Sequence, residues 1–390
     1  MGLFDLFLVA SVPVSEVLLI TALGSFLAFE NVGILGENAR KSLNNVVFYV
    51  FNPALVSSNL AQTVTFDNFI KLWFMPFNVL ITFLVGAAMG WILVKVTKAP
   101  QHLKGLILGS CAAGNLGNLP LIIIPAICKE KASPFGAPDV CHSYGLAYVS
   151  LSMAIGAIFL WSFVYNIVRV SSSQAAIKPI MEPLLPSEGC STRDYDPFSS
   201  PSCNKISMTS RIKQHLVNFA ERMNLKAVLA PSTTGAIVGF IIGMIPWVRS
   251  LLIGGTAPLR FIQNSASMLG DAAIPSVTLI MGGNLLKGLK GSGVQPAIVI
   301  GIIAVRYIFL PLLGILVVKS AIHFGLVHSD PLYQFVLLLQ FVVPPAMNIG
   351  TITQLFGAGQ SECSVIMLWA YSLASVSLTL WSTFFMWLVA

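Results

Sequence analysis

Long apolar runs recur along nearly the whole chain and constrain its fold more than any other feature. A helix that crosses a bilayer needs about 20 predominantly apolar residues. Of the 390 residues, 56% are hydrophobic and 9% are charged, whereas a soluble globular chain carries about 25% charged residues. We therefore predict an all-α, multi-pass integral membrane protein with ten transmembrane helices. The expected segments are 11–29, 42–62, 69–95, 104–128, 144–169, 226–247, 257–286, 294–319, 332–356 and 363–389.

A long polar stretch, residues 170–225, divides the ten segments into five and five. It is rich in Ser, Pro and charged residues, a composition that favours a flexible loop over packed structure. We therefore expect a first five-helix repeat at 1–169, this loop, and a second five-helix repeat at 226–390.

Matching irregularities in the two halves indicate that they are repeats of one unit. The second segment of each half has a proline near its middle, Pro53 after Asn52 in the first half and Pro275 in the second. The fourth segment of each half is interrupted by Gly, Asn and Pro. The interrupted stretches read AGNLGNLP at 113–120 and VPPAMNIG at 343–350.

Lys and Arg are unevenly distributed over the connections between segments. About two thirds of the 22 lie on the connections after odd-numbered segments, the long loop included. By the positive-inside rule this loop is cytosolic and both termini are lumenal or external. With five helices in each half, the second repeat is inverted relative to the first.

The two interrupted segments are the main candidates for a binding site. Broken helices in a membrane are tolerated where protein or a water-filled cavity satisfies the freed backbone groups. The half-helix N-termini carry partial positive charge that suits a carboxylate, and Asn side chains would add amide donors. Simple kinking of ordinary helices is the alternative, but breaks in both halves favour a site. The residues expected there are Asn115, Asn118, Pro120, Pro344, Pro345 and Asn348.

Few ionisable residues fall in or beside the apolar segments, and each is a functional candidate. Asp271 could take up a proton or hold backbone freed by Pro275. Arg306 could neutralise an anionic substrate or form a structural ion pair with Asp271. Asp67 and Lys71 are four residues apart at the start of the third segment. Their spacing alone favours a surface ion pair over a polar post beside a solute path.

Other classes of function find little support in the sequence. The basic residues lie in short connections rather than in a nucleic-acid-binding patch, and the cysteines and histidines lack zinc-site spacing. Residues 282–284 (GGN) lack the Lys-Ser/Thr of a nucleotide-binding loop. We expect no enzyme activity, metal, cofactor or nucleic acid. Cys128 and Cys141 both lie toward the same predicted lumenal connection. They could form a disulfide or remain free thiols.

The arrangement of these motifs resembles the PIN-LIKES auxin carriers of plants. The likeness rests on Asn52-Pro53, on the motifs at 113–120 and 343–350, and on two five-helix halves around a hydrophilic loop. It covers essentially the whole chain apart from that loop.

The resemblance implies a fold related to the PIN-FORMED auxin exporters and, more distantly, to bile-acid sodium symporters and the sodium/proton antiporter fold. There, helices one, two, six and seven form a scaffold, the others form a moving transport domain, and helices four and nine cross. It also implies a homodimer in the endoplasmic reticulum membrane, although no Lys-Asp-Glu-Leu-type tail marks retention. An Asp–Lys pair supports the substrate in those exporters, and Asp67 and Lys71 match its spacing.

We therefore expect a carrier of auxin (indole-3-acetic acid) and related small organic acids that works by an elevator-like movement. The carboxylate would bind Asn115, Asn348 and the half-helix ends, and the indole ring would lie near Pro53 and Pro275. Two alternatives stay open. One is a sodium- or proton-coupled carrier of another organic anion, and the other is a non-transporting membrane receptor that binds auxin.

Overall fold

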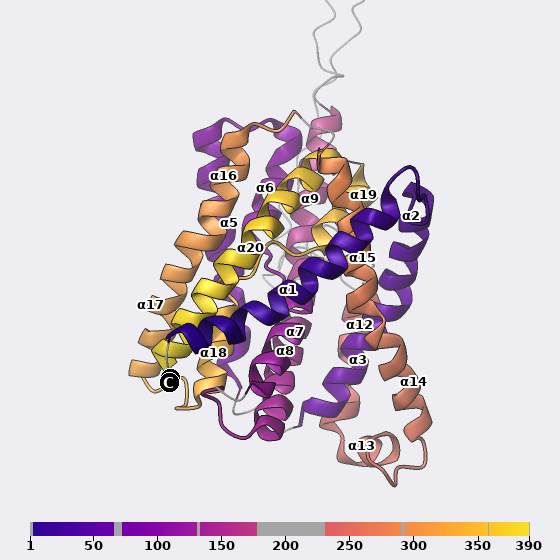
Figure 1. Ribbon diagram of the computed structural model, residues 1–390, viewed down its shortest axis with the longest axis vertical. Coiled ribbons are helices and arrows are strands. Elements are labelled where there is room, and N and C mark those ends of the chain that lie inside the picture. Colours follow the sequence, from indigo (N-terminus) through magenta and orange to yellow (C-terminus); the bar gives the residue numbers. More distant parts are fainter. Residues whose placement is uncertain are drawn as a thin grey trace, which may run out of the picture.

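The computed structural model describes residues 3–65, 72–130, 133–177, 231–289, 293–357 and 359–389. Throughout these ranges the chain forms helices joined by short connections, and their β-type pairing is limited to one isolated antiparallel bridge, between Gly114 and Pro345. The all-α prediction is therefore confirmed for the described part of the chain (Figure 1).

Helices occur at each of the ten expected ranges. Those of the first half are α1 (Leu3–Ala28), α2 (Glu37–Val46), α3 (Asn52–Thr63), α5 (Phe74–Thr97), α6 (Lys104–Ala112), α7 (Asn118–Lys129), α8 (Pro138–Phe159) and α9 (Tyr165–Ile177). Those of the second half are α12 (Pro231–Met244), α13 (Pro246–Leu252), α14 (Arg260–Asp271), α15 (Ala273–Leu289), α16 (Pro296–Ala304), α17 (Leu310–His323), α18 (Pro331–Leu339), α19 (Asn348–Phe356) and α20 (Gln360–Val389).

Several expected spans are built from two helices rather than one. Within the described ranges, five helices are long and apolar enough to cross a membrane, or six if α12 and α13, bent by 102°, form one span. Three π-helical turns join α2 to α3, α8 to α9 and α16 to α17; they are Val47–Phe51, Leu160–Val164 and Val305–Phe309. A multi-pass membrane protein follows from these helices, and the ten-span inverted repeat remains a prediction.

The expected boundaries of the central loop need one adjustment. The fifth span continues as α9 to Ile177, past the expected end at 169. The rest of the expected loop, 178–225, and the first residues of the second half, 226–230, lie outside the described residues.

Close helix packing joins the second span of the first half to the sixth span. Gly235 and Gly239 of α12 lie against α3, where an added Cβ would come within 2.5 Å of the backbone oxygens of Pro53 and Ser57. Small residues at four-residue spacing let membrane helices approach this closely. The α3–α12 pair lies beside α14 and α15 on one side of the molecule, and α1 packs on α15 and runs diagonally across the front to α20 (Figure 1).

The main buried cluster draws residues from most of the helices, and α18 is among its most buried parts. Residues 335–339 of α18 are each at most 2% exposed, as expected for a helix that is apolar all round. By contrast, large apolar side chains such as Leu19, Val96 and Ile300 are exposed on the outer faces of α1, α5 and α16. Lipid tails would cover these outer faces in a bilayer.

Candidate functional site at two crossing helix breaks

The two interrupted segments meet and pair through their backbones. The break between α6 and α7 covers residues 113–117, and the break between α18 and α19 covers 340–347; together we call them the crossing. The Asn115 backbone N–H donates to the Pro344 carbonyl at 2.8 Å, and the Ala346 N–H donates to the Ala113 carbonyl at 2.9 Å. Each break thus satisfies backbone groups that the other exposes, as an apolar interior requires.

Proline and glycine explain why the chain adopts this pairing. Pro344 and Pro345 have no N–H and cannot continue α18, so they offer carbonyls alone. Gly114 permits the close approach, because an added Cβ there would lie 2.6 Å from Cγ2 of Val343. Any larger residue at Gly114 would push the two breaks apart.

Asn115 holds the crossing together rather than offering its amide to a ligand. Its Oδ1 accepts from the Asn118 backbone N–H at 3.1 Å, which caps the N-terminus of α7, and its Nδ2 donates to the Tyr371 hydroxyl at 3.0 Å. Tyr371, on α20, donates in turn to the Pro345 carbonyl at 2.8 Å. Asn115 is only 5% exposed. The carbonyl oxygen and one amide hydrogen of Asn115 are therefore already used within the protein, and its predicted role as a donor to a ligand stays a prediction.

A cavity of about 60 Å³ lies on one side of the crossing, and we call it the Asn118 cavity. Asn118 and Asn348 are the first residues of α7 and α19, so both half-helix N-termini border it. It brings together four of the predicted residues with an aromatic ring and a hydroxyl. Its lining includes Asn52, Asn115, Asn118, Asn348, Trp161 and Ser232.

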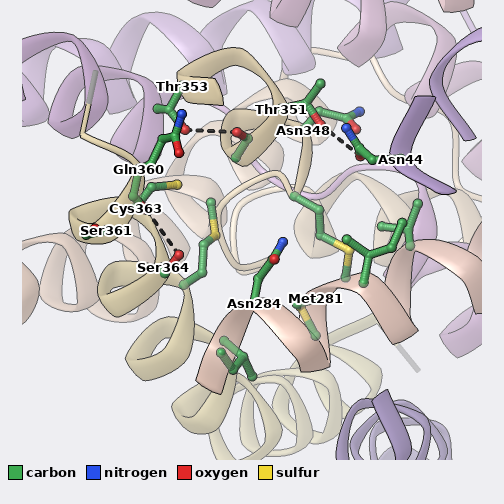
Figure 2. A pocket seen from close by; sticks show the side chains of 16 residues that line it. Asn44, Met281, Asn284, Asn348, Thr351, Thr353, Gln360, Ser361, Cys363 and Ser364 are labelled. Carbon is green, nitrogen blue, oxygen red and sulfur yellow. Dashed lines mark hydrogen bonds between the residues drawn. The ribbon is translucent and has the colours of Figure 1, made fainter. Parts of the chain in front are cut away.

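A second cavity, of about 110 Å³, lies on the other side of the α19 N-terminus, and we call it the Gln360 cavity (Figure 2). Met347 and Asn348 line both cavities. Within the described part of the chain, the Asn348 side chain has no hydrogen-bond partner. The polar residues lining the Gln360 cavity are Asn44, Asn284, Asn348, Thr351, Thr353, Gln360, Ser361 and Ser364.

A third cavity, of about 140 Å³, continues from the Gln360 cavity and is lined by Glu37, Arg40 and Lys41. It shares Asn44 and Asn284 with the Gln360 cavity. Arg40 is 8% exposed and donates from Nη1 to the Leu35 carbonyl. A series of adjoining cavities therefore leads from charged residues at the α2 end to Asn348.

The prolines predicted to break the second and fourth spans, Pro53, Pro120 and Pro275, lie near the starts of α3, α7 and α15. Pro120 follows the break at 113–117, where the first N–H groups of α7 have no partner within the helix. Pro53 follows the π-helical turn Val47–Phe51, and Pro275 follows the interruption at Ala272, so each lies at an irregularity within a continuing span. Pro53 and Pro275 do not line the cavities described above, although their neighbours Asn52 and Val277 do. The expected indole position against these two prolines is therefore not supported.

The ionisable candidates lie apart. Asp271 is exposed at the end of α14, whereas Arg306 is 1% exposed in the turn between α16 and α17. Arg306 donates from Nε to the Ser110 carbonyl at 2.9 Å, and no carboxylate among the described residues pairs with it. The considered Arg306–Asp271 ion pair is therefore not formed. Asp67 and Lys71 lie outside the described residues.

Sequence reasoning missed Tyr371 and a buried network beside the crossing. Asn78 of α5 donates to Oε1 of Gln340 at 2.7 Å, and Nε2 of Gln340 donates to Ser152 of α8 at 3.0 Å. Asn78 and Gln340 could have been found, because a side-chain amide inside an apolar segment is a candidate for a buried polar contact. Nothing in the sequence around Tyr371 distinguishes it from other tyrosines.

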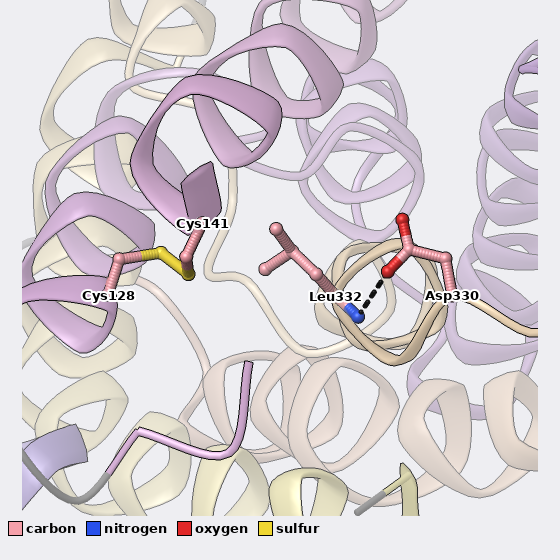
Figure 3. The surroundings of a disulfide bond; sticks show 4 residues. All are labelled: Cys128, Cys141, Asp330 and Leu332. Atoms are coloured by element: carbon pink, nitrogen blue, oxygen red, sulfur yellow. Dashed lines mark hydrogen bonds between the residues drawn. A yellow bond between two sulfur atoms is a disulfide. The ribbon is translucent and has the colours of Figure 1, made fainter. Parts of the chain in front are cut away.

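The disulfide alternative is confirmed, because Cys128 and Cys141 are bonded with a Cα–Cα distance of 5.5 Å (Figure 3). The bond joins the end of α7 to the start of α8. Nearby, Asp330 caps α18 by accepting from the Leu332 N–H at 3.0 Å and also accepts from the Tyr148 hydroxyl. Across the described ranges, no group of three or more His, Cys, Asp or Glu residues could hold a metal ion.

Comparisons with known proteins agree with this architecture. Residues 9–382 match the family model described as "Membrane transport protein". The chain is 55% identical to Protein PIN-LIKES 1 of Arabidopsis thaliana over 393 residues, covering all of this chain and 81% of that protein. It is 53% identical to Protein PIN-LIKES 3 of the same plant, covering all of this chain and 99% of that protein.

A more distant relative extends the likeness beyond plants. An uncharacterized transporter of Schizosaccharomyces pombe is 19% identical over 91% of this chain and 89% of its own length. The family model matches nearly the whole chain, and the plant relatives are similar to it over its full length, so together they show its family. The chain belongs to the Membrane transport protein family and, within it, to the PIN-LIKES proteins.

Proposed function

We propose that this protein carries auxin, as indole-3-acetate, and related small organic acids across a membrane. The observation that carries the proposal is the Asn118 cavity, where the N-termini of α7 and α19 meet beside half-buried Asn side chains. Helix N-termini and amide N–H groups favour a carboxylate. The family membership supports transport, and the names of the plant relatives point to the auxin carriers.

Asn348 is the side chain best placed to meet the substrate carboxylate. It starts α19, it lines both cavities, and no described residue uses its amide. Asn118 is the second such residue, with only a weak contact of 3.8 Å between its Nδ2 and Sδ of Met347. Asn115 acts indirectly by capping α7 and tying the crossing to Tyr371.

An elevator-like movement is the mechanism that we propose. Helices α1, α3, α12, α14 and α15 pack on one another and would form the scaffold. The crossing, with α5, α8, α16 to α18 and α20, would move as one body. The series of cavities toward the α2 end would serve as the access path in this conformation.

Uptake of radiolabelled indole-3-acetic acid into proteoliposomes tests the proposal. We expect saturable uptake with the parent protein and loss of most uptake with Asn348→Ala. Asn166→Ala is a matched control, because Asn166 is half-buried on α9, bonds to the Ser162 carbonyl and lines none of the cavities described above. Unchanged uptake in Asn348→Ala would remove this site assignment.

The same assay separates the alternatives. Uptake that vanishes when sodium is replaced by choline would select a sodium-coupled carrier, and dependence on an imposed pH gradient would select proton coupling. Saturable binding without flux into sealed vesicles would select a non-transporting auxin receptor. Asp67 and Lys71, proposed to support the substrate, and Asp271, proposed as a coupling residue, can be tested by alanine variants in this assay.

We further propose an endoplasmic reticulum location, lumenal termini and a homodimer. The Cys128–Cys141 disulfide supports an oxidising compartment on the side of the α7–α8 connection. Fluorescence co-localisation with a reticulum marker tests the location, and cysteine labelling from either side of the membrane tests the orientation. Cross-linking in native membranes tests the dimer, with Asn348→Ala as a control because its substitution lies outside the proposed scaffold.

A further inference from the structure

Arg306 is the most deeply buried charged side chain in the described part of the molecule. Among the described residues, the charged side chains that are buried are Arg40 at 8% exposed and Arg306 at 1%. Arg306 lies in the π-helical turn Val305–Phe309, in the interior of the long apolar span Pro296–His323. An isolated charge in such surroundings carries a large desolvation penalty.

The guanidinium group lies directly behind the crossing. Its Nε donates to the Ser110 carbonyl at the end of α6, whereas Nη1 and Nη2 have no hydrogen-bond partner among the described residues. An ideal Cβ added to Gly114 would lie 3.2 Å from Nη1 and 3.5 Å from Nη2. Gly114 also lines the Asn118 cavity, so little more than its backbone separates the guanidinium from the cavity.

A purely structural role does not account for this arrangement. Arginine remains charged in proteins, and a buried charge without an opposite partner destabilises a fold unless something compensates it. A neutral side chain of similar size would satisfy the Ser110 carbonyl or the packing at lower energy. The missing negative charge is supplied if an anion occupies the cavity on the far side of Gly114, where low dielectric keeps the attraction strong.

We propose that Arg306 is the fixed counter-charge for an anionic substrate in the Asn118 cavity, acting through Gly114 without touching the substrate. This inference rests on the proposed function and adds the charge state of the carrier to it. Because Arg306 is bonded to α6, it travels with the crossing. Among the described residues of the moving body, and apart from the charges at the helix ends, Arg306 leaves one positive charge when the body is empty and none when it holds a monoanion.

This charge distribution has a consequence for transport. Exchange of labelled for unlabelled substrate uses only the loaded body, which is neutral, so its rate should not depend on the membrane potential. Net uptake requires the return of the empty body, whose positive charge responds to the potential. Without Arg306 the loaded body is negative, and exchange itself becomes dependent on potential.

A binding measurement tests the inference independently of transport. The purified protein is titrated with indole-3-acetic acid and with its uncharged analogue indole-3-acetamide. For Arg306→Gln we expect the acid to bind about tenfold or more weakly, with little change for the amide, and Arg306→Lys to restore most of the affinity for the acid. Arg249→Gln is the control, because Arg249 of α13 also donates to backbone carbonyls, those of Ala61 and Gln62 on the proposed scaffold helix α3, and lines none of the cavities described above.

The outcomes separate this inference from the proposed function. Equal weakening of acid and amide, or no rescue by Arg306→Lys in a folded variant, would show a structural role and overturn the inference. Parent exchange that changes with an imposed potassium diffusion potential would also overturn it. Binding without any flux would overturn the carrier function alone, while the acid-to-amide comparison would still decide the role of Arg306. A parent protein that binds neither compound would overturn both.

Discussion

The two half-helices that begin at the crossing, α7 and α19, differ in how firmly they are held. Asn115 caps the start of α7, and a disulfide fixes its end at Cys128. At the start of α19, Asn348 lines two cavities and its side chain has no described partner. We infer that the first break provides a rigid frame and that the second presents the ligand-binding amide.

The difference is informative because the sequence aligns these positions. Placing Asn115 on Asn348 also places Gly117 on Gly350, which predicts equivalent roles. In the structure, Asn115 lies inside its break and Asn348 is the first residue of its helix. A repeated motif therefore shows where two breaks occur, and its register with the helix determines what each residue does.

The largest expected effect comes from removing the disulfide that holds α7. Its loop spans 13 residues of sequence separation, and closing such a loop stabilises a fold by about 3 kcal/mol. We expect the double variant Cys128→Ser, Cys141→Ser to lower the melting temperature of the purified protein by several degrees. Cys363→Ala, which removes a buried free thiol near α19, should have a smaller effect. Equal effects would contradict the view that α7 alone is pinned.

Asn115→Ala should have the second-largest effect on stability, a loss of about 2 kcal/mol of unfolding free energy. The estimate combines a lost helix cap, about 1 kcal/mol, with a lost buried hydrogen bond to Tyr371, about 1 kcal/mol. Thermal unfolding followed by circular dichroism measures it. A variant as stable as the parent would show that Asn115 does not hold the crossing.

Asn348→Ala should reverse this pattern. Because no described residue depends on its side chain, stability should change by no more than about 0.5 kcal/mol. Binding of indole-3-acetic acid should weaken about tenfold, which corresponds to about 1.4 kcal/mol. Calorimetric titration and thermal unfolding of the same sample give both quantities. Strong destabilisation with intact binding would exchange the roles assigned to the two asparagines.

The smallest effects test the aligned glycines. An added Cβ at Gly117 would lie 2.7 Å from Cγ of Met153, whereas one at Gly350 meets nothing within 4 Å. Gly117→Ala should destabilise the protein by about 1 kcal/mol, and Gly350→Ala within α19 should stabilise it by about 0.5 kcal/mol. Thermal unfolding of the two variants side by side provides the measurement, and a shift of the same sign in both would indicate equivalent surroundings.

Much of the fold was predictable because the bilayer restricts the choices. Apolar length located helices in all ten expected ranges, and the Gly-Asn-Pro patterns located both breaks at the crossing. Residues whose role depends on a distant partner were not predictable. The sequence around Tyr371 does not indicate that its hydroxyl bonds to both breaks. The sequence around Pro53 does not indicate that this residue packs against α12 rather than lining a cavity.

The sequence by itself determined that the chain is a helical membrane protein with two interrupted segments, since apolar length, glycine and proline act locally on the backbone. Only the tertiary structure decided that the Asn115 amide is hydrogen-bonded within the protein, whereas the Asn348 amide has no described partner. It also decided where the buried charge of Arg306 lies. Asn115, Asn348 and Arg306 are each defined by partners more than 190 positions away or by the lack of one. Such contacts depend on how helices pack, which a single segment does not encode.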